Sequence, residues 1–264
     1  MLPTDPRAFL GRDAVSYSEI GTLARCEQAW KYGYDSDTER SPASKAMALG
    51  TELHRLWGHY HLDPDSPRHL DTEDDTARWL MERYVQYYDR LPMVAVEQPV
   101  ILKLAGGPNF FGFADGLFED DGAVEFESAA PGELWAAELK TTGNLSNVAH
   151  MLQSLQTKLY VAALRDMGFP VVGVMLDVIR TFRPVKKELP LPESFQRHWL
   201  RWSDEEIDGA LDEVASALTS RIALQSGRRP LRNIGPSCSW CSHMAPCFGL
   251  ELDILDEDDP DVAR

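Results

Sequence analysis

Two carboxylates and a lysine near the middle of the sequence have the types and spacing needed for chemistry on phosphate esters. Glu138 and Lys140 flank Leu139, and Asp115 precedes them in Gly112-Phe-Ala-Asp115-Gly116. Residues i and i+2 of a strand face the same side, so Glu138 and Lys140 point together, and Asp115 joins them if its strand lies alongside. Two carboxylates form a hard oxygen site suited to Mg²⁺ or Mn²⁺. A lysine beside them can orient a water and neutralise developing phosphate charge, so the pattern predicts metal-dependent phosphodiester hydrolysis.

Three residues elsewhere in the chain strengthen this interpretation. His54 ends Gly50-Thr-Glu-Leu-His54, and Gln156 and Tyr160 stand at positions i and i+4, on one face of a later helix. Each feature has an ordinary explanation when taken alone: a surface Glu-x-Lys pair, a structural histidine, or a buried polar pair in a helix. Their combination in this order favours one site.

The four cysteines form a group of three and one distant member, Cys26 followed by Cys238, Cys241 and Cys247. Four thiolates are the ligand set of a tetrahedral metal site or an iron–sulfur cluster. The spacing leaves three interpretations open: two disulfides, which are rare in the cytosol; a structural Zn²⁺, with His243 nearby; or a 4Fe-4S cluster. Either metal would tie Cys26 to the C-terminal group and stabilise the fold.

The elements that must position these residues change in type along the chain. Apolar periodicity and turn residues predict helices first, then a meander of strands, then helix and strand again. The predicted helices cover residues 16–32, 46–60, 76–91, 148–167 and most of 192–225. The predicted strands cover residues 94–104, 110–118, 123–126, 134–141 and 171–180. This order predicts an α/β core with a helical lobe packed on it.

The net charge of -16 looks unfavourable for a protein that binds nucleic acid, because phosphate binding is driven by Lys and Arg. Much of that charge lies in two segments: residues 62–76 hold six acids against one arginine, and residues 251–264 hold seven against one. Residues 178–187 and 221–232 each hold four basic residues and no acid. This distribution is compatible with DNA binding.

The composition, with 44% hydrophobic and 26% charged residues, is typical of a globular protein. The first 15 residues lack the apolar run of a secretory signal. No stretch approaches the roughly 20 apolar residues of a membrane span. We therefore expect a cytoplasmic protein with no membrane association.

Taken in order, Gly-x-x-x-His, Gly-x-x-Asp, Glu-x-Lys and Gln-x-x-x-Tyr resemble the RecB-like branch of the PD-(D/E)XK nuclease superfamily. The resemblance runs from Ser16 to Cys247. It implies a restriction-endonuclease-like core, a mixed central sheet flanked by helices, with an N-terminal helical lobe and a C-terminal cysteine cluster. The interval from Asp115 to Glu138 is long for this family, which indicates an additional excursion around residues 120–133.

The resemblance also implies a role for each motif residue. Metal ligation falls to His54, Asp115 and Glu138, with the Leu139 carbonyl as a further ligand. Lys140 is the implied catalytic lysine, and Gln156 and Tyr160 position DNA or order the site. CRISPR-associated RecB-like exonucleases and the AddB-type subunit of helicase–nucleases carry the same one-plus-three cysteine arrangement, which favours a structural 4Fe-4S cluster at Cys26, Cys238, Cys241 and Cys247 over Zn²⁺.

These expectations describe an Mg²⁺- or Mn²⁺-dependent deoxyribonuclease of DNA repair or recombination. The family favours a 5′→3′ exonuclease acting on single-stranded or free DNA ends over an endonuclease. The alternatives are a recombination or spacer-processing subunit in a larger complex, and a catalytically silent, zinc-stapled DNA-binding module. Helicase or recombination proteins are the implied partners, and the oligomeric state stays open. Near the N-terminus, Trp30, Tyr32, Tyr34 and Trp57 are candidates to stack on bases or to pack in the core.

Four segments are expected to form one compact unit. They are an N-terminal helical lobe (residues 1–92) carrying Cys26 and His54, a nuclease core (93–190), a C-terminal helix with the cysteine segment (191–250), and an acidic tail (251–264).

Overall fold

The structure is a computed structural model that describes residues 14–35, 44–63, 65–105, 107–122, 130–181 and 190–250. The chain divides into two compact units. The first comprises Met1–Tyr17 and Ala43–Ala215, and the second comprises Ser18–Pro42 and Ser216–Arg264. His54 and Cys26, which the sequence analysis assigns to one N-terminal lobe, therefore fall in different units.

A six-stranded mixed sheet organises the first unit. Its strands are β1 (Ala14–Val15), β2 (Met93–Lys103), β3 (Asn109–Glu119), β4 (Leu134–Thr142), β5 (Val171–Arg180) and β6 (Phe195–Leu200). The order is β1-β3-β4-β5-β6, with β2 paired to β3. The β1–β3 and β4–β5 pairs are parallel and the others antiparallel. The predicted α/β class with a mixed central sheet flanked by helices is confirmed.

The two helices between β4 and β5 cover one face of the sheet. A parallel strand pair needs a crossover connection, which here consists of η3 (Leu145–Asn147), α6 (Val148–Leu152) and α7 (Leu155–Asp166). The prediction of one helix over residues 148–167 is wrong at Gln153 and Ser154. Ser154 has extended backbone and its side chain accepts from the Gln156 N–H, so it starts a new helix. Gln156 therefore lies in the first turn of α7.

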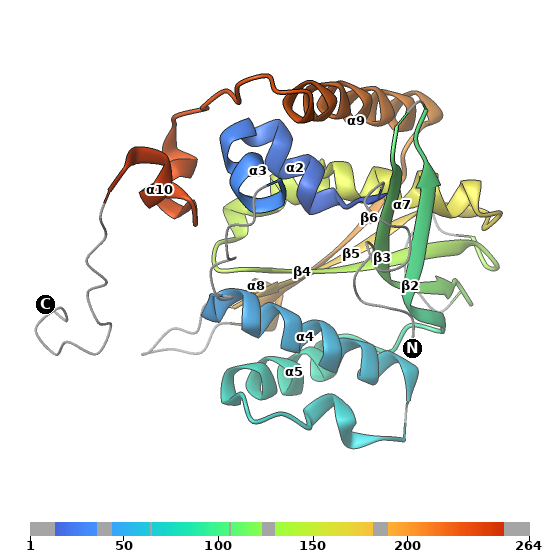
Figure 1. The fold of residues 1–264 in the computed structure, drawn as a ribbon. Coiled ribbons are helices and arrows are strands. Elements are labelled where there is room, and N and C mark those ends of the chain that lie inside the picture. The colour runs from blue at the N-terminus through green and yellow to red at the C-terminus, as the bar shows by residue number, and fades with distance from the viewer. Residues whose placement is uncertain are drawn as a thin grey trace, which may run out of the picture. The chain divides into compact units, whose positions relative to one another are not determined.

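The opposite face is covered by α4 (Lys45–Leu62) and α5 (Asp75–Tyr87), joined through η2 (Pro67–Leu70). Figure 1 shows these two helices on one side of the sheet and α7 on the other. A single apolar cluster fills the space between α4, α5 and the sheet, and it includes Leu53, Leu56, Trp57, Leu80, Met81, Trp135, Ala137, Leu139 and Met175. This packing fixes α4 against the strands that carry the predicted acidic residues.

The prediction of mostly helix from residue 192 to 225 is wrong in its first part, where the chain forms strand β6. Residues Leu191–Ser194 form α8, the chain is then extended through β6, and α9 begins at Asp204 and ends at Gln225. Phe195, Arg197 and Trp199 alternate along β6, and Arg197 is paired with the fully buried Asp177 on β5. Because the inward position 197 carries an arginine, the sequence does not show the alternation of apolar and polar residues that is typical of a strand.

The second unit contains α2 (Tyr17–Arg25) beyond its first residue, α3 (Glu27–Tyr34), the end of α9, η4 (Pro236–Trp240) and α10 (Met244–Phe248). The predicted helix 16–32 is interrupted at Cys26, whose backbone is extended (φ -163, ψ 112). Leu23, Trp30 and Leu224 form a small core there. Trp30 is 1% exposed, as is Trp57 in the first unit, so both pack in cores and neither is a base-stacking residue.

Some predictions fall outside the described residues. These are the strand at 123–126, most of the excursion at 120–133, the basic residues Arg183, Lys186 and Lys187, and the acidic tail 251–264. Among the helices that the structure describes, none is both long and apolar enough to cross a membrane.

Candidate active site

Asp115 lies where the sheet forks. Strand β2 pairs along one edge of β3, so β1 and β4 share the other edge. Strand β1 pairs with β3 only as far as Phe110. The pairing of β3 with β4 begins at Gly116, which lies opposite Ala137. Beyond that point β4 continues alongside β5, and its Leu139 N–H donates to Asp115 Oδ2 at 2.7 Å. The Asp115 side chain thus accepts the hydrogen bond that a backbone carbonyl of a neighbouring strand would otherwise accept. Its carboxylate lies in the fork where β3 and β4 separate.

His54 reaches the same carboxylate from α4. Its Nδ1 lies 2.9 Å from Asp115 Oδ1. One turn earlier, a Cβ on Gly50 would lie 3.3 Å from Thr141 Oγ1, so glycine allows α4 to approach β4 closely. Burial lowers the pKa of His54, but the Asp115 carboxylate more than offsets this and leaves the pKa raised. The Gly-x-x-x-His spacing therefore delivers an imidazole to the fork.

Glu138 is the most buried acid of the set, at 2% exposed. Its Oε1 accepts from Lys140 Nζ at 2.5 Å and from Gln156 Nε2 at 2.9 Å. Its Oε2 is buried, and the described residues offer it no hydrogen-bond partner. Burial and the nearby Asp115 charge raise the pKa of Glu138, while Lys140 opposes the rise. One carboxylate oxygen is therefore available in a buried position beside a second acid.

Gln156 and Tyr160 connect the two arms of the fork. Gln156 Nε2 donates to Glu138 on β4 and to the Tyr160 hydroxyl, 2.8 Å away. The Tyr160 ring lies against β3, where a Cβ on Gly112 would approach it to 3.0 Å. Glycine at position 112 is needed for this close approach. The Gln-x-x-x-Tyr pair thus links Glu138 to the strand that carries Asp115.

The site gathers Asp115, Glu138, Lys140, His54, Gln156 and Tyr160, all of which the sequence analysis assigns to it. The Leu139 side chain is buried in the opposite face, and its N–H holds Asp115. Within the described ranges, no three His, Cys, Asp or Glu side chains lie close enough together to hold a metal. The site acids instead pair with His54, Lys140, Gln156 and the Leu139 amide.

Two residues near the fork lie outside the four predicted motifs. Glu97 on β2 stands opposite Asp115, because Val96 pairs with Gly116 and Gln98 with Ala114. Its φ of 50° is unfavourable for a residue with a side chain. Burial lowers the pKa of Lys140, the charges of Glu138 and Asp115 raise it above its usual value, and Tyr17 lies close enough to add a smaller rise. Neither residue belongs to a motif whose spacing could have identified it.

The four cysteines all belong to the second unit, where they are free thiols and half-buried. The segment around Cys26 is bonded to the segment that leads to Cys238. Asn233 Nδ2 donates to the Arg25 carbonyl at 2.9 Å, and the Leu231 N–H donates to Glu27 Oε2 at 2.9 Å. Arg228 Nη2 lies 2.6 Å from Glu27 Oε1.

Helix α3 also contacts the segment that precedes Cys247. The Tyr32 and His243 rings lie 5.7 Å apart, and the Tyr32 hydroxyl donates to the Pro246 carbonyl at 3.4 Å. Both sequence neighbourhoods of the cysteines are therefore held together inside one unit. The identity of any metal there stays a prediction.

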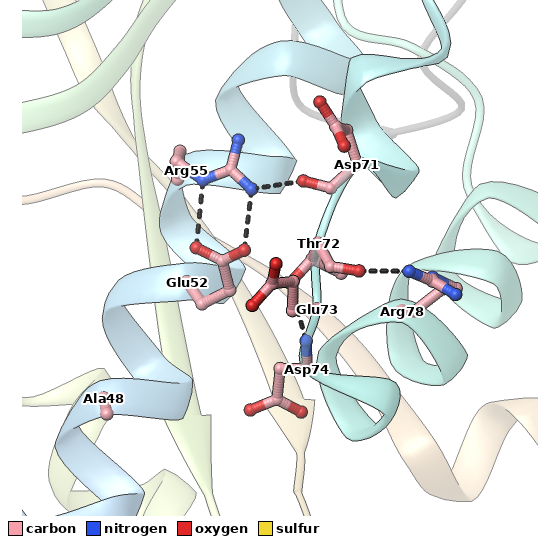
Figure 2. Close-up of a pocket in the computed structure, with 8 residues that line it drawn as sticks. All are labelled: Ala48, Glu52, Arg55, Asp71, Thr72, Glu73, Asp74 and Arg78. Atoms are coloured by element: carbon pink, nitrogen blue, oxygen red, sulfur yellow. Dashed lines mark hydrogen bonds and ion pairs between the residues drawn. The ribbon is translucent and has the colours of Figure 1, made fainter.

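A separate hollow of about 620 Å³ lies between α4 and the segment that leads into α5 (Figure 2). It is lined by Ala48, Glu52, Arg55, Asp71, Thr72, Glu73, Asp74 and Arg78. Glu52 forms a two-pronged ion pair with Arg55, and Asp74 caps α5 by accepting from the N–H groups of Thr76 and Ala77. These carboxylates have structural partners, so the fork remains the candidate active site.

The chain matches no protein-family model and no curated protein. Among solved structures, it is similar to a protein from Eubacterium rectale described as a "putative exonuclease", with a TM-score of 0.56 and 13% identity. That match covers 91% of this chain and 93% of the other. A second structure, SSO0001, gives a TM-score of 0.48 at 13% identity, over 89% and 86% of the two chains. At this identity the first likeness concerns the fold alone, and the second is too low to carry an argument.

Proposed function

We propose that this chain is a metal-dependent DNA nuclease that hydrolyses phosphodiester bonds at the β3–β4 fork. The observation that carries the proposal is the grouping of Asp115, Glu138 and Lys140 there, with Glu138 Oε2 buried and lacking a partner among the described residues. A buried acceptor without a partner is unfavourable by roughly 1–3 kcal/mol in a folded protein. A cation at this atom would remove that penalty.

The residues present fit a divalent cation. Burial and the charge of Asp115 together raise the pKa of Glu138, so a positive ion between the two carboxylates would be stabilised. Their oxygens suit Mg²⁺ or Mn²⁺, and the His54 imidazole and Leu139 carbonyl complete the proposed ligand set. When bound, such an ion supplies Lewis-acid activation of the phosphate and of a water.

Lys140 has a distinct role in this proposal. Burial lowers its pKa, but Glu138 and Asp115 more than offset this, so the pKa is raised and the ammonium stays charged at neutral pH. A fixed positive charge there stabilises the negative charge that develops on the phosphate oxygens. Gln156 and Tyr160 act as positioning residues, because they hold Glu138 against β3.

The proposed substrate is DNA with free single-stranded ends, degraded from the 5′ end. The strand preference and polarity rest on the motif resemblance. Among the basic residues proposed to contact DNA, Arg221 and Arg228 are already engaged by Glu19 and Glu27 in the second unit. Arg229 and Arg232 are exposed in the same segment and are the better candidates for phosphate contacts.

A 4Fe-4S cluster bound by the four cysteines is the second part of the proposal. It is supported by the bonds that hold the Arg25–Gln28 segment to residues 228–233 and by the four free thiols. Protein purified without oxygen should be brown, and Cys26→Ala should lose both the colour and several degrees of thermal midpoint. A colourless protein with stoichiometric Zn²⁺ would show that the site is a zinc site.

The nuclease assignment is tested by digestion of single-stranded DNA labelled at either end, with Mg²⁺ or Mn²⁺. Lys140→Ala should reduce the rate at least about 100-fold, as is usual when a charge stabilising the transition state is lost. Lys103→Ala, at the exposed end of β2, is the matched control and should leave the rate unchanged. Equal activity of wild type and Lys140→Ala would overturn the catalytic assignment, and the end that is released first decides the polarity.

A further inference from the structure

One aromatic residue at the fork has no part in the proposed hydrolysis. Phe113 lies two residues before Asp115 on β3, so the two side chains share a face of the strand. They are about 6.6 Å apart along the strand. That spacing is close to the separation between a phosphate group and the base of its own nucleotide. Pro99, the cross-strand partner of Phe113, adjoins the Glu97–Asp115 position.

The exposure of Phe113 differs from that of its neighbours in the same strand. Phe110 is 0% exposed and Phe111 is 4% exposed, whereas Phe113 is only half-buried. Phe113 also lies in the stretch of β3 between the partners β1 and β4, where neither strand pairs with it. Phe113 thus keeps part of its surface open to solvent on the face of β3 that it shares with Asp115.

The ring is held in place. It meets the Phe111 ring edge to face, with centroids 5.1 Å apart and an interplanar angle of 89°. The preceding residue, Gly112, is in close contact with Tyr160, which Gln156 anchors to Glu138. A preorganised aromatic ring binds a flat partner with little loss of side-chain entropy.

We propose that Phe113 is a stacking residue for the base adjacent to the scissile phosphate. This inference rests on the proposed nuclease function and extends it to the substrate. A phenyl ring offers no hydrogen bond, so its contact with a base is sequence-tolerant, and base–aromatic stacking contributes about 1–3 kcal/mol. A base can reach the ring only when it is unstacked from a duplex. The substrate segment at the fork is therefore single-stranded, or splayed at an end.

The test pairs a change in the protein with a change in the DNA. Single-stranded oligonucleotides carry one abasic nucleotide at successive positions from the labelled end, and kcat/KM is measured for wild type, Phe113→Leu and Phe113→Trp. At one position, removal of the base should lower wild-type kcat/KM by about 5- to 150-fold, the equivalent of that stacking energy. Phe113→Leu should lose a similar factor on intact DNA and show no further loss on the abasic substrate, and Phe113→Trp should restore the wild-type pattern.

The control is Phe169→Leu, a half-buried phenylalanine in the turn between α7 and β5, which should keep the wild-type ratio. The inference is overturned if wild type and Phe113→Leu respond equally to the abasic nucleotide at every position. If wild type cleaves no DNA, the proposed function fails, and the stacking inference is then judged by binding. In fluorescence anisotropy with labelled intact and abasic oligonucleotides, Phe113→Leu should weaken binding of the intact strand only. Equal affinities of wild type and Phe113→Leu for the intact strand would overturn the stacking inference.

Discussion

Two buried carboxylates on adjacent strands of the sheet differ in how far their oxygens are hydrogen-bonded. Asp177 on β5 pairs in register with Leu139, one residue after Glu138 on β4, so the two acids lie on opposite faces. Asp177 accepts from Arg197 through both oxygens, at 2.7 and 2.8 Å, and its Oδ2 also accepts from the Tyr84 hydroxyl at 2.5 Å. Glu138 has both of its bonds on one oxygen and a second oxygen with no partner among the described residues.

Asp177 is thus an acid that stabilises the fold, whereas Glu138 is the acid that we propose takes part in chemistry. A buried ion pair stabilises a protein only when its remaining hydrogen-bonding capacity is satisfied, as it is around Asp177. Glu138 has a neighbouring lysine, but its second oxygen has no partner among the described residues and a like charge lies nearby, as expected of the cation site that we propose. Substitutions at the two positions should therefore affect different properties.

The largest expected effect is the loss of stability on Asp177→Asn. The change leaves the Arg197 guanidinium buried without a counter-charge, and breaking such a pair reduces the free energy of unfolding by about 3–5 kcal/mol. Urea unfolding followed by circular dichroism measures it, with Asp166→Asn on the exposed side of α7 as the control. A loss below about 1 kcal/mol would show that the two acids are not distinguished by stability.

Glu138→Gln should show the reverse behaviour. Removing the carboxylate should reduce the rate of DNA degradation about 100- to 1000-fold, the range typical of losing one electrostatic group of an active site. The free energy of unfolding should stay constant or rise, because the repulsion from Asp115 disappears. Glu119→Gln, at the exposed end of β3, is the control for both measurements. A destabilised but active variant would contradict the assignment.

The histidine next to the Asp177 network should make stability depend on pH. His61 Nδ1 accepts from the Leu91 N–H, and burial lowers the pKa of His61 to about 3. The unfolded chain, with a histidine pKa near 6.5, binds a proton that the folded chain does not, so stability falls as the pH drops from about 6.5 towards 3. Between pH 7 and pH 5 the loss should be about 2 kcal/mol. It should be absent in His61→Gln, and an equal loss in both proteins would assign it to other groups.

The smallest expected effect is stabilisation by the cation itself. Mn²⁺ at 10 times its dissociation constant should stabilise the wild-type protein by about 1.4 kcal/mol, seen as a rise of a few degrees in thermal midpoint. Glu138→Gln should show little of this rise. Asp177→Asn should show the full rise, although its thermal midpoint without Mn²⁺ is lower. An undiminished rise in the thermal midpoint of Glu138→Gln would show that the ion binds elsewhere.

The contrast between these two acids also shows what the sequence can predict. The fork residues are predictable because each lies in a motif with a geometric reason: Gly50 before His54, Gly112 before Asp115, and Gln156 one turn before Tyr160. The long strands β2 to β5 are predictable because their apolar runs end at turn residues.

Other features depend on contacts between distant residues. Strand β6 carries a charged side chain inward because Asp177, 20 residues earlier, receives it. The break at Ser154 and the extended Cys26 depend on capping and on how neighbouring segments pack. Glu97 has an unfavourable φ opposite Asp115, and its own sequence neighbourhood gives no sign of this.

The central claim, that the free oxygen of Glu138 marks a metal site for DNA hydrolysis, is tested most directly by the anomalous scattering of a crystal soaked in Mn²⁺. We predict one anomalous peak at the fork, in contact with Glu138 Oε2 and the Asp115 carboxylate, which is absent from crystals of Glu138→Gln. A crystal with no peak at the fork, at an Mn²⁺ concentration that supports DNA degradation in solution, would contradict it.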